Sequence, residues 1–348
     1  MLSHRLHTVN SRYHALPCLA LLLACSTNAF AAADAYRVAD RQVLAGPVRW
    51  DYLSVDSARH HLFLTRGDQV DVYDTATKQI TGSIANTKGV HGVAVAQEQE
   101  RGYTSNGASD SVTVFSLATL DAITTVPVGA KPDAIIYDAH SARVFVANGK
   151  GASLSVIAAP TNKVIGTIAL GGQPETAVVD GKGRLYIAIE NKNAVAVIDT
   201  DSLKVLRQID VASVCDEPAG LAIDVEAAHL FVGCHNKTMT VLDAVTGKIL
   251  ASPHIGAGND AVAFDPERKL AFASNGEGSL TVVDGTAPYA VRQTLVTMPR
   301  ARTMALDPAT HAIYLTSADV AHDGPPLPAG ARPTLKAGSF VVLTVTAP

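Results

Sequence analysis

Short apolar stretches separated by turn residues recur along most of this chain. Residues 133–174 hold one complete copy, in which apolar or alternating stretches occupy 134–137, 144–147, 154–157 and 164–170. Asn-Gly and Gly-Gly pairs follow the second and the fourth of these stretches. Short runs rich in Val and Ile and bounded by such turns are typical of antiparallel strands that follow one another along the chain. The pattern therefore predicts four consecutive β-strands in each copy.

The residue that ends the first strand of each copy recurs at a nearly constant interval. It is an aspartate in six copies and an alanine in one, at Asp56, Ala96, Asp138, Asp180, Asp224, Asp265 and Asp307. Successive positions are 40, 42, 42, 44, 41 and 42 residues apart. A period of about 40 to 50 residues with four strands per unit indicates a β-propeller, because solenoid units carry fewer strands. Seven positions predict an all-β, seven-bladed propeller of four-stranded antiparallel blades.

The two ends of the chain are predicted to complete one blade. The last copy begins near Thr303 and stops after a third strand at 340–345, whereas a strand-like segment at 37–44 belongs to no copy. If the N-terminal strand completes the last blade, the ring closes without an exposed sheet edge. We therefore expect residues 34–348 to form a single propeller domain. In the last copy a Pro/Gly-rich loop at 317–339 replaces a tight turn, and it is long enough to cover one mouth of the channel.

Residues 1–32 have the features of a bacterial secretory signal peptide. Arg5 and Arg12 form a basic start, residues 16–24 form a short apolar core, and residues 29–31 (Ala-Phe-Ala) offer a cleavage site. The residues before Cys25 approximate a lipoprotein processing box, so lipid attachment at Cys25 is the alternative. The expected location is the periplasm. After the N-terminus no apolar stretch is long enough to predict a transmembrane helix.

Charge and cysteine content narrow the choice of partners. Without residues 1–32 the chain has 26 basic and 32 acidic residues, a net charge of −6. Nucleic-acid-binding proteins usually present a basic surface, so this charge makes nucleic acid an unlikely partner. Soluble processing would leave Cys215 and Cys234, and an even count in an oxidising compartment favours a disulfide between them. A thiolate metal site with His235 is the alternative.

Seven positions are predicted to meet at one mouth of the central channel, because each lies five residues before the recurring strand-end residue. They are Asp51, His91, Asp133, Glu175, Ala219, Asp260 and Arg302. Clustered carboxylates with an imidazole suit a divalent metal or a cationic ligand, whereas Arg302 suits an anionic group. Crowded carboxylates would also raise one another's pKa, as general acid–base catalysis requires. The alternative is a merely polar rim, whose acids accept hydrogen bonds from loop amides.

Three further side chains are expected at the same rim. Trp50, the only tryptophan, adjoins Asp51 and suits either stacking on a ligand or packing. His254 and His322 fall on loops of this rim, where a lone histidine is usually exposed and without function. No metalloprotease, nucleophile-elbow, C-x-x-C or P-loop motif occurs, so motifs assign no reaction.

Several segments resemble a known family of bacterial propellers. FVANGKGASLSVIAAPTNKVIGTI at 145–168 and YIAIENKNAVAVIDTDSLKVLRQI at 186–209 are similar to the YVTN-type repeats of YncE-like β-propellers. Further similarity lies in VHGVAV at 90–95, CDEPAGLAID at 215–224, VGCHNKTMTVLD at 232–243 and the closing GSFVVLTV. Some third strands depart from the usual V-I-D ending, as at Phe115-Ser116 and Ile157-Ala158.

The resemblance implies a secreted or periplasmic seven-bladed propeller, often without an assigned reaction. Single-stranded DNA binding has been proposed within the family. Related propellers act in haem-derivative maturation, lactone hydrolysis or metal-dependent lyase chemistry. No motif in this chain allows catalytic residues to be carried over from any of them.

These observations predict a periplasmic propeller that binds a small molecule, a metal ion or an envelope protein, and that is a monomer. The expected ligand-binding residues at the channel rim are Trp50, Asp51, His91, Asp133, Glu175, Asp260 and Arg302. One alternative is a divalent-metal-dependent lyase or hydrolase, whose metal ligands would be drawn from Asp51, His91, Asp133, Glu175 and Asp260. The other alternative is a protein-interaction scaffold of the cell envelope.

Overall fold

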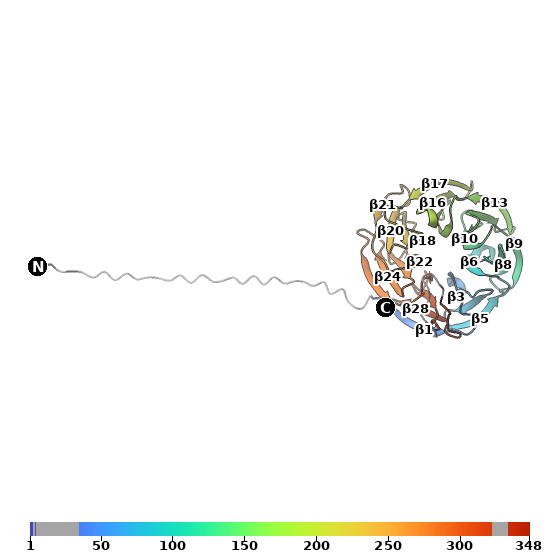
Figure 1. Ribbon diagram of the computed structural model, residues 1–348, viewed down its shortest axis with the longest axis horizontal. Helices are drawn as coiled ribbons and strands as arrows, with labels where there is room; N and C mark the ends of the chain where they lie inside the picture. Colours follow the sequence, from blue (N-terminus) through green and yellow to red (C-terminus); the bar gives the residue numbers. More distant parts are fainter. Residues whose placement is uncertain (3, 5–34, 322–332) are drawn as a thin grey trace. The chain divides into compact units, whose positions relative to one another are not determined.

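Seven sheets form a ring in the computed structural model, which describes residues 1, 2, 4, 35–321 and 333–348 (Figure 1). The chain divides into two units, Met1–Asp34 and Ala35–Pro348, and the second unit contains the ring. Each sheet has four antiparallel strands paired in chain order from the inside outward, except the closing one. This arrangement confirms the predicted all-β, seven-bladed propeller.

The first four blades follow one another without exception. Blade one contains β2 (Leu53–Asp56), β3 (His61–Thr65), β4 (Val70–Asp74) and β5 (Gln79–Ile84). Blade two contains β6 (Val90–Ala96), β7 (Arg101–Asn106), β8 (Ser111–Ser116) and β9 (Ala122–Pro127). Blade three contains β10 (Pro132–Asp138), β11 (Arg143–Asn148), β12 (Ser153–Ala158) and β13 (Lys163–Ala169). Blade four contains β14 (Pro174–Val179), β15 (Arg184–Ile189), β16 (Ala194–Asp199) and β17 (Lys204–Asp210).

The remaining blades include the two irregular ones. Blade five contains β18 (Pro218–Asp224), β19 (His229–Cys234), β20 (Thr238–Asp243) and β21 (Ile249–Ala251). Blade six contains β22 (Asn259–Asp265), β23 (Leu270–Asn275), β24 (Ser279–Asp284) and β25 (Val291–Val296). Blade seven contains β26 (Met304–Leu306), β27 (Ile313–Ser317), β28 (Val341–Thr346) and β1 (Arg37–Val43). The helical segments in the described part are 3-10 turns at Ser57–Arg59, Gln97–Gln99 and Glu190–Lys192.

The N-terminal strand closes the ring as predicted. β1 pairs antiparallel with β28, from Arg37 opposite Thr346 to Val43 opposite Val341. Blade five departs from the repeat, because its fourth strand, β21, ends at Ala251. Pro253, which has no amide hydrogen for a sheet ladder, follows closely, and only an isolated bridge joins Thr238 to His254.

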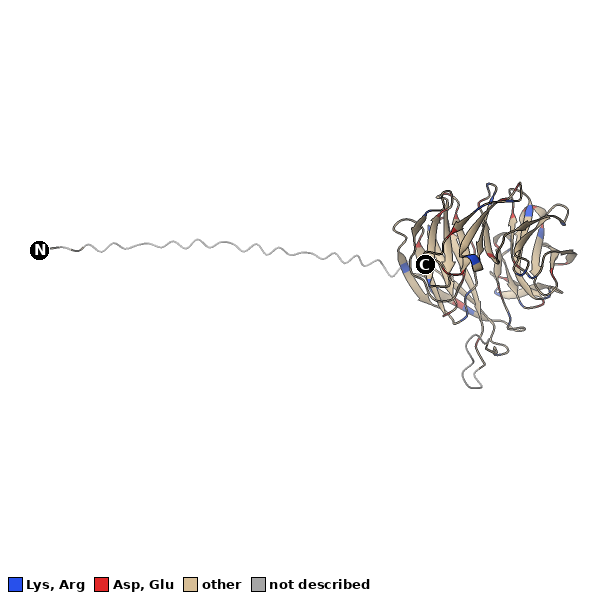
Figure 2. Cartoon of the chain, turned by 45° about the horizontal axis from the view of Figure 1, so that its top comes forward, with Lys and Arg blue, Asp and Glu red and all other residues tan. Residues whose placement is uncertain are grey.

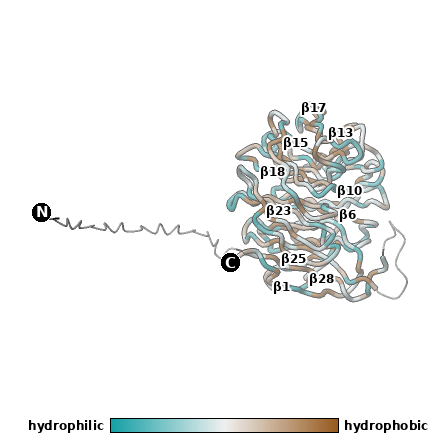
Figure 3. Tube along the Cα trace, turned by 60° about the vertical axis from the view of Figure 1, so that its left-hand side comes forward, coloured by the Kyte–Doolittle hydropathy of each residue, from teal (hydrophilic) through white to brown (hydrophobic). Residues whose placement is uncertain are grey.

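The hydrophobic core lies between neighbouring blades. Middle strands such as β11 and β19 are buried almost throughout, whereas outer strands such as β13 are mostly exposed. Aromatic rings join adjacent blades: Phe63 and Phe115 have centroids 5.7 Å apart, and Phe231 stacks on Phe264 at 5.1 Å. Figure 3 shows apolar segments along many of the strands. Closing the ring therefore gives every blade two packing partners.

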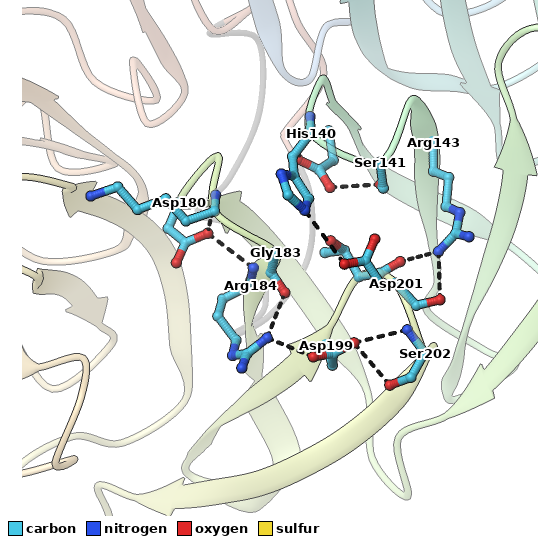
Figure 4. A network of polar contacts seen from close by, with 12 residues as sticks. His140, Ser141, Arg143, Asp180, Gly183, Arg184, Asp199, Asp201 and Ser202 are labelled. Atoms are coloured by element: carbon cyan, nitrogen blue, oxygen red, sulfur yellow. Dashed lines mark hydrogen bonds and ion pairs between the residues drawn. The ribbon is translucent and has the colours of Figure 1, made fainter.

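The recurring aspartates stabilise turns at the rim where the inner strands end. Asp180 accepts hydrogen bonds from the amides of Lys182 and Arg184, at 2.7 and 2.9 Å (Figure 4). Between blades three and four, Arg143 donates to the carbonyl oxygen of Asp201 at 2.9 Å. The contacts of Asp180 give this repeated aspartate a structural role in its turn.

The position that ends the second strand also has a structural role. Asn148 and Asn275, each followed by glycine, donate from Nδ2 to serine and threonine hydroxyls of the adjoining strand. In blade one Arg66 takes this position and is fully buried. Its guanidinium lies 3.8 Å from the Phe340 ring centroid and 3.2 Å from a carboxylate oxygen of Asp71.

Candidate functional site

The seven predicted rim residues lie where the inner strands begin. Asp51 and Arg302 lie two residues before β2 and β26, and the others are near the start of their strands: His91 in β6, Asp133 in β10, Glu175 in β14, Ala219 in β18 and Asp260 in β22. Labels β6, β10, β18 and β22 surround the centre of the ring in Figure 1. The inner strands therefore present these residues at one mouth of the channel.

A break in strand pairing accompanies five of these residues. The register between first and second strands shifts between Val90 and Gly92, and equivalent shifts surround Asp133, Glu175, Ala219 and Asp260. A β-bulge leaves one residue out of the ladder and changes the direction of its side chain. The repeated bulge thus explains how one residue in each of these five blades, at a fixed distance from the strand end, reaches the channel mouth.

Asp51, His91 and Asp133 form the tightest group at this mouth. His91 Nδ1 lies 2.6 Å from Asp51 Oδ2 and 3.5 Å from Asp133 Oδ1. The Asp51 backbone is fixed from both sides, since its amide donates to the Thr65 hydroxyl at 2.8 Å and its carbonyl accepts from the Thr303 hydroxyl at 2.9 Å. Blades one, two, three and seven thus position this group together.

The protonation of this group follows from its surroundings. Partial burial lowers the pKa of His91, but the hydrogen bond to Asp51 and the charge of Asp133 outweigh it, so the pKa is raised overall. Burial raises the pKa of Asp133, and the attraction of His91 only partly opposes this rise. The imidazole is therefore held toward its charged form between two carboxyl groups.

Asp260 and Arg302 form an ion pair across blades six and seven. Arg302 Nε lies 3.1 Å from Asp260 Oδ2; the Asp260 side chain is 13% exposed, whereas that of Arg302 is 53% exposed. Burial raises the pKa of Asp260 to about 6, although Arg302 opposes the rise. The charge of Asp260 in turn raises the pKa of Arg302.

Glu175 has the most perturbed carboxyl group at the mouth. Burial raises its pKa to about 8, and the charges of Asp133 and Asp260 add to the rise. Gln173 opposes it by donating to Glu175 Oε1 at 3.0 Å, and Gln173 also donates to Glu190. Glu175 is therefore largely protonated at neutral pH.

Tyr52, which the sequence analysis did not single out, reaches across the channel. It belongs to blade one but packs against the apolar cluster of blades three and four that includes Ala134 and Ala177. Burial and the nearby carboxylates, chiefly Asp260 and Asp133, raise its pKa well above 10. Its amide donates to the carbonyl oxygen of His91 at 3.0 Å.

A signal for Tyr52 was present in the repeat. The equivalent position is small in the six other copies: Gly92, Ala134, Thr176, Gly220, Ala261 and Thr303. Neighbouring inner strands approach closely here, since a Cβ atom on Gly220 would lie 2.7 Å from the Val262 nitrogen. One large side chain among six small ones therefore marks a residue that fills the channel.

A cavity of about 690 Å³ opens at this mouth, and we call it the mouth cavity. Four predicted rim residues line it, Trp50, Asp51, His91 and Arg302. The other lining residues are Val48, Arg49, His235, Gly258, Gly276, Arg300, Pro333 and Leu335. Arg49 and Arg300 were not predicted, because they lie in connecting segments whose positions the repeat does not define.

Trp50 and the blade-seven loop form the apolar side of the mouth cavity. The centroids of the Trp50 and Phe340 rings lie 5.8 Å apart, and the Arg300 guanidinium lies 6.0 Å from the centroid of the Trp50 ring. The loop contributes Pro333 and Leu335, and an isolated bridge joins Leu335 to Val320. The described end of the predicted 317–339 loop thus reaches this mouth, while 322–332, with His322, lie outside the described residues.

Two other cavities contain none of the predicted rim residues. One of about 540 Å³ lies among blades four to six and is lined by residues that include Lys182, Phe264 and Lys269. The other, of about 700 Å³, shares His235 with the mouth cavity and includes Glu190 and Glu217. Only the mouth cavity therefore coincides with the ring predicted from the repeat, as far as the described residues show.

Three of the five residues predicted as metal ligands come together. One donor atom each of Asp51, His91 and Asp133 can be chosen so that all three lie within 4.8 Å of one another. Glu175 and Asp260 are not part of this group, because they interact with Gln173 and Arg302 instead. A second group with the same spacing, Glu190, Glu217 and His235, is more exposed.

The predicted disulfide is present. The Cys215 and Cys234 sulfurs are bonded at 2.01 Å, and both residues are buried. Since the two thiols are joined to each other, the alternative thiolate metal site with His235 is wrong. The bridge joins the segment before β18 to the end of β19.

Comparisons with known proteins support the fold. No protein-family model matches the sequence, and a search of curated proteins finds no similar one. Among solved structures, a chain of Kuenenia stuttgartiensis hydrazine synthase is similar, with a TM-score of 0.68 and 16% identity, over 79% of this chain and 93% of that chain. The likeness is one of fold. At this identity it carries no statement about activity.

Within the described residues, no helix is both long and apolar enough to cross a membrane. Acidic and basic residues are interspersed over the propeller in Figure 2.

Proposed function

We propose that this protein is a periplasmic, YncE-like propeller that binds a small ligand in the mouth cavity and does not transform it. The observation that carries the proposal is the coincidence of a cavity of about 690 Å³ with Trp50, Asp51, His91 and Arg302. The spacing of the repeat alone predicts three of these residues, Asp51, His91 and Arg302, as rim positions. A concave site with a few convergent polar groups is the usual form of a small-molecule site.

The proposed location rests on two features. Residues 1–32 have the composition of a secretory signal, and the alternative is a lipid anchor at Cys25. The Cys215–Cys234 disulfide favours an oxidising compartment. YncE-like membership is supported by the resemblance of the repeats and by the seven-bladed ring.

Native mass spectrometry of protein secreted with its own N-terminal segment tests ligand binding. We expect extra mass from a co-purified small molecule on the wild type, and its loss from His91→Ala. His140→Ala, at the opposite rim and paired with Asp201 at 3.4 Å, is the matched control and should keep the ligand. Bare polypeptide in all three proteins, or a ligand retained by His91→Ala, would contradict the proposal.

A second candidate is a divalent-metal-dependent enzyme, a lyase or hydrolase, with its metal held by Asp51, His91 and Asp133. Their converging donor atoms favour it. With all groups ionised, the four rim carboxylates exceed His91 and Arg302 by two negative charges. The protonation of Glu175 relieves this excess, and a bound divalent cation would relieve it as well.

Calorimetric titration with Mn²⁺ and with Zn²⁺ tests this candidate. We expect Asp133→Asn to weaken binding by at least about tenfold, because it removes a charged ligand. Asp201→Asn, an exposed acid at the other rim, is the control. Equal affinity of all three proteins, or no heat of binding, excludes the metal site. If co-purification and metal titration both fail, the envelope scaffold becomes the better proposal.

A further inference from the structure

The lining of the mouth cavity is cationic, although the chain as a whole is acidic. Three arginines and two histidines line it against one carboxylate, Asp51, which His91 already pairs with. The full chain has a net charge of −4. The other carboxyl groups nearby do not reverse this balance, since Asp260 is paired with Arg302, Glu217 is paired with His235 at 2.8 Å and Glu175 is largely protonated at neutral pH. Asp133 faces His91.

Arg302 is held so that it can bind a second anionic group. Its contact with Asp260 uses Nε, at 3.1 Å, and the side chain remains half exposed. Among the described residues no further hydrogen bond of its two terminal nitrogens is found. A guanidinium presents five N–H donors in a planar fork that suits carboxylate or phosphate oxygens. Asp260 thus orients the Arg302 guanidinium and leaves its two terminal nitrogens able to donate to a ligand.

Arg49, in the segment before β2, supplies a second cation to the lining of the mouth cavity. It is exposed, lies beside Gly67 and forms no ion pair with any described residue. Arg300 adds a third, although it is already engaged with the face of Trp50 at 6.0 Å. The backbone turn that joins Arg300 and Arg302, with the Arg302 amide donating to the Arg300 carbonyl at 2.8 Å, directs both side chains to the same cavity.

The rest of the lining is apolar. Val48, Trp50, Pro333 and Leu335 come from the segment before β2 and from the blade-seven loop. A ligand with only charged groups would leave this side unused, whereas an apolar ring could lie against Trp50.

We infer that the mouth cavity binds a small organic anion, with its carboxylate or phosphate on Arg302 and Arg49 and its apolar part against Trp50 and Leu335. This inference rests on the proposed function, because it names the ligand class of the same cavity. It replaces the cationic ligand that the acidic ring alone suggested. The three arginines and Asp51 line the cavity, whereas Asp133, Glu175 and Asp260 are not among its lining residues.

A set of three probes of one shape and different charge tests the inference. Benzoate, benzamide and benzamidinium share a phenyl ring but carry a negative charge, no charge and a positive charge. Binding is measured by calorimetry and by the fluorescence of Trp50, which reports on this cavity alone because the chain has one tryptophan. We expect benzoate to bind about tenfold more tightly than benzamide, and benzamidinium not to bind.

Arginine variants separate the anion site from general binding. Arg49→Gln should weaken benzoate binding about tenfold and leave benzamide unchanged, because it removes a charge but no ion pair of the described residues. Arg302→Gln should also weaken benzoate binding about tenfold and leave benzamide binding unchanged. The thermal melting curve of this variant shows whether the fold is disturbed when Asp260 loses its ion-pair partner. Arg37→Gln, on the outermost strand, is the matched control and should bind like the wild type.

Each contrary result has a distinct meaning. If benzamide or benzamidinium binds as tightly as benzoate and changes Trp50 fluorescence, the cavity is a binding site but the anionic class is wrong. Benzoate binding that both arginine variants retain in full also overturns the inference. If no probe binds at millimolar concentration and no ligand co-purifies, both the anion inference and the proposed function fail. Salt-sensitive binding of oligo-dT without benzoate binding would assign the cavity to a polynucleotide and overturn the small-anion inference.

Discussion

Replacing Glu175 with glutamine should change how the stability of the propeller depends on pH. The glutamine side chain has nearly the shape of a protonated glutamate and keeps an oxygen that can accept the 3.0 Å hydrogen bond from Gln173. It cannot ionise. The substitution therefore removes one titration from the channel mouth while preserving its packing.

The magnitude follows from the pKa of this group in the two states. The pKa of Glu175 is 4.5 for an unperturbed side chain and about 8 in the folded protein. Between these values the folded state keeps a proton that the unfolded state has lost, so stability falls as pH rises from 4.5 to about 8. Each pH unit in this interval costs about 1.4 kcal/mol. Because the carboxyl groups of Asp133 and Asp260 adjust their protonation in response, we expect a net cost of about 2–4 kcal/mol.

Urea unfolding from about pH 5 to about pH 9 measures this cost. Trp50 fluorescence and far-ultraviolet circular dichroism should give coincident transitions if unfolding is two-state. We expect Glu175→Gln to match the wild type near pH 5 and to exceed it by about 2–4 kcal/mol near pH 9. Glu226→Gln, whose side chain is 83% exposed, is the control and should follow the wild type.

Two outcomes would refute this reasoning. If the Glu175→Gln and wild-type curves stay parallel across the range, the Glu175 carboxyl group does not retain its proton in the folded state. If the variant is less stable near pH 9, the ionised carboxylate is stabilised there by a cation or donor, which would favour the metal site.

Three further predictions concern the scaffold. Replacing Cys215 and Cys234 with serine should lower the free energy of unfolding by about 3 kcal/mol, because the bridge closes a loop of 19 residues, and comparison with reduced wild type checks the value. Arg66→Met should cost about 3–5 kcal/mol in urea unfolding, since it leaves the Asp71 carboxylate without its buried partner. Deleting residues 35–43 should expose the edge of β28 and cause concentration-dependent aggregation visible in light scattering. A monodisperse deletion variant would mean that β1 is dispensable for closure.

The fold could be predicted from the sequence because one spacing controls it. The interval of 40 to 44 residues between strand-end positions implies four short strands per unit, and the orphan strand before β2 can pair only where the last copy is incomplete. The exception was the outer strand of blade five, where Pro253 prevents the ladder from continuing beyond Ala251. Local chemistry overrode the repeat at that point.

The candidate site was only partly predictable. Asp51, His91 and Asp133 come together because they occupy equivalent positions of the repeat, and a repeat-based alignment identifies such positions. Arg49 and Arg300 lie in connecting segments, where the repeat does not fix the direction of a side chain. The charge of the mouth was consequently misjudged, since counting only the ring gives four carboxylates and a single arginine.

The propeller is nearly symmetric in its backbone, whereas its channel mouth is not. Asp133 and Glu175 are on blades three and four, respectively, and Arg302 and Arg49 come from the segments beside blades seven and one. Tyr52 extends from blade one toward blades three and four, whereas the residue at the equivalent position is small in every other copy. A molecule in the mouth cavity therefore meets the arginines and Asp51 beside blades seven and one, whereas Asp133 and Glu175 are not among the lining residues. This uneven distribution of charge orients a ligand with one charged end, which a uniformly acidic ring would not do.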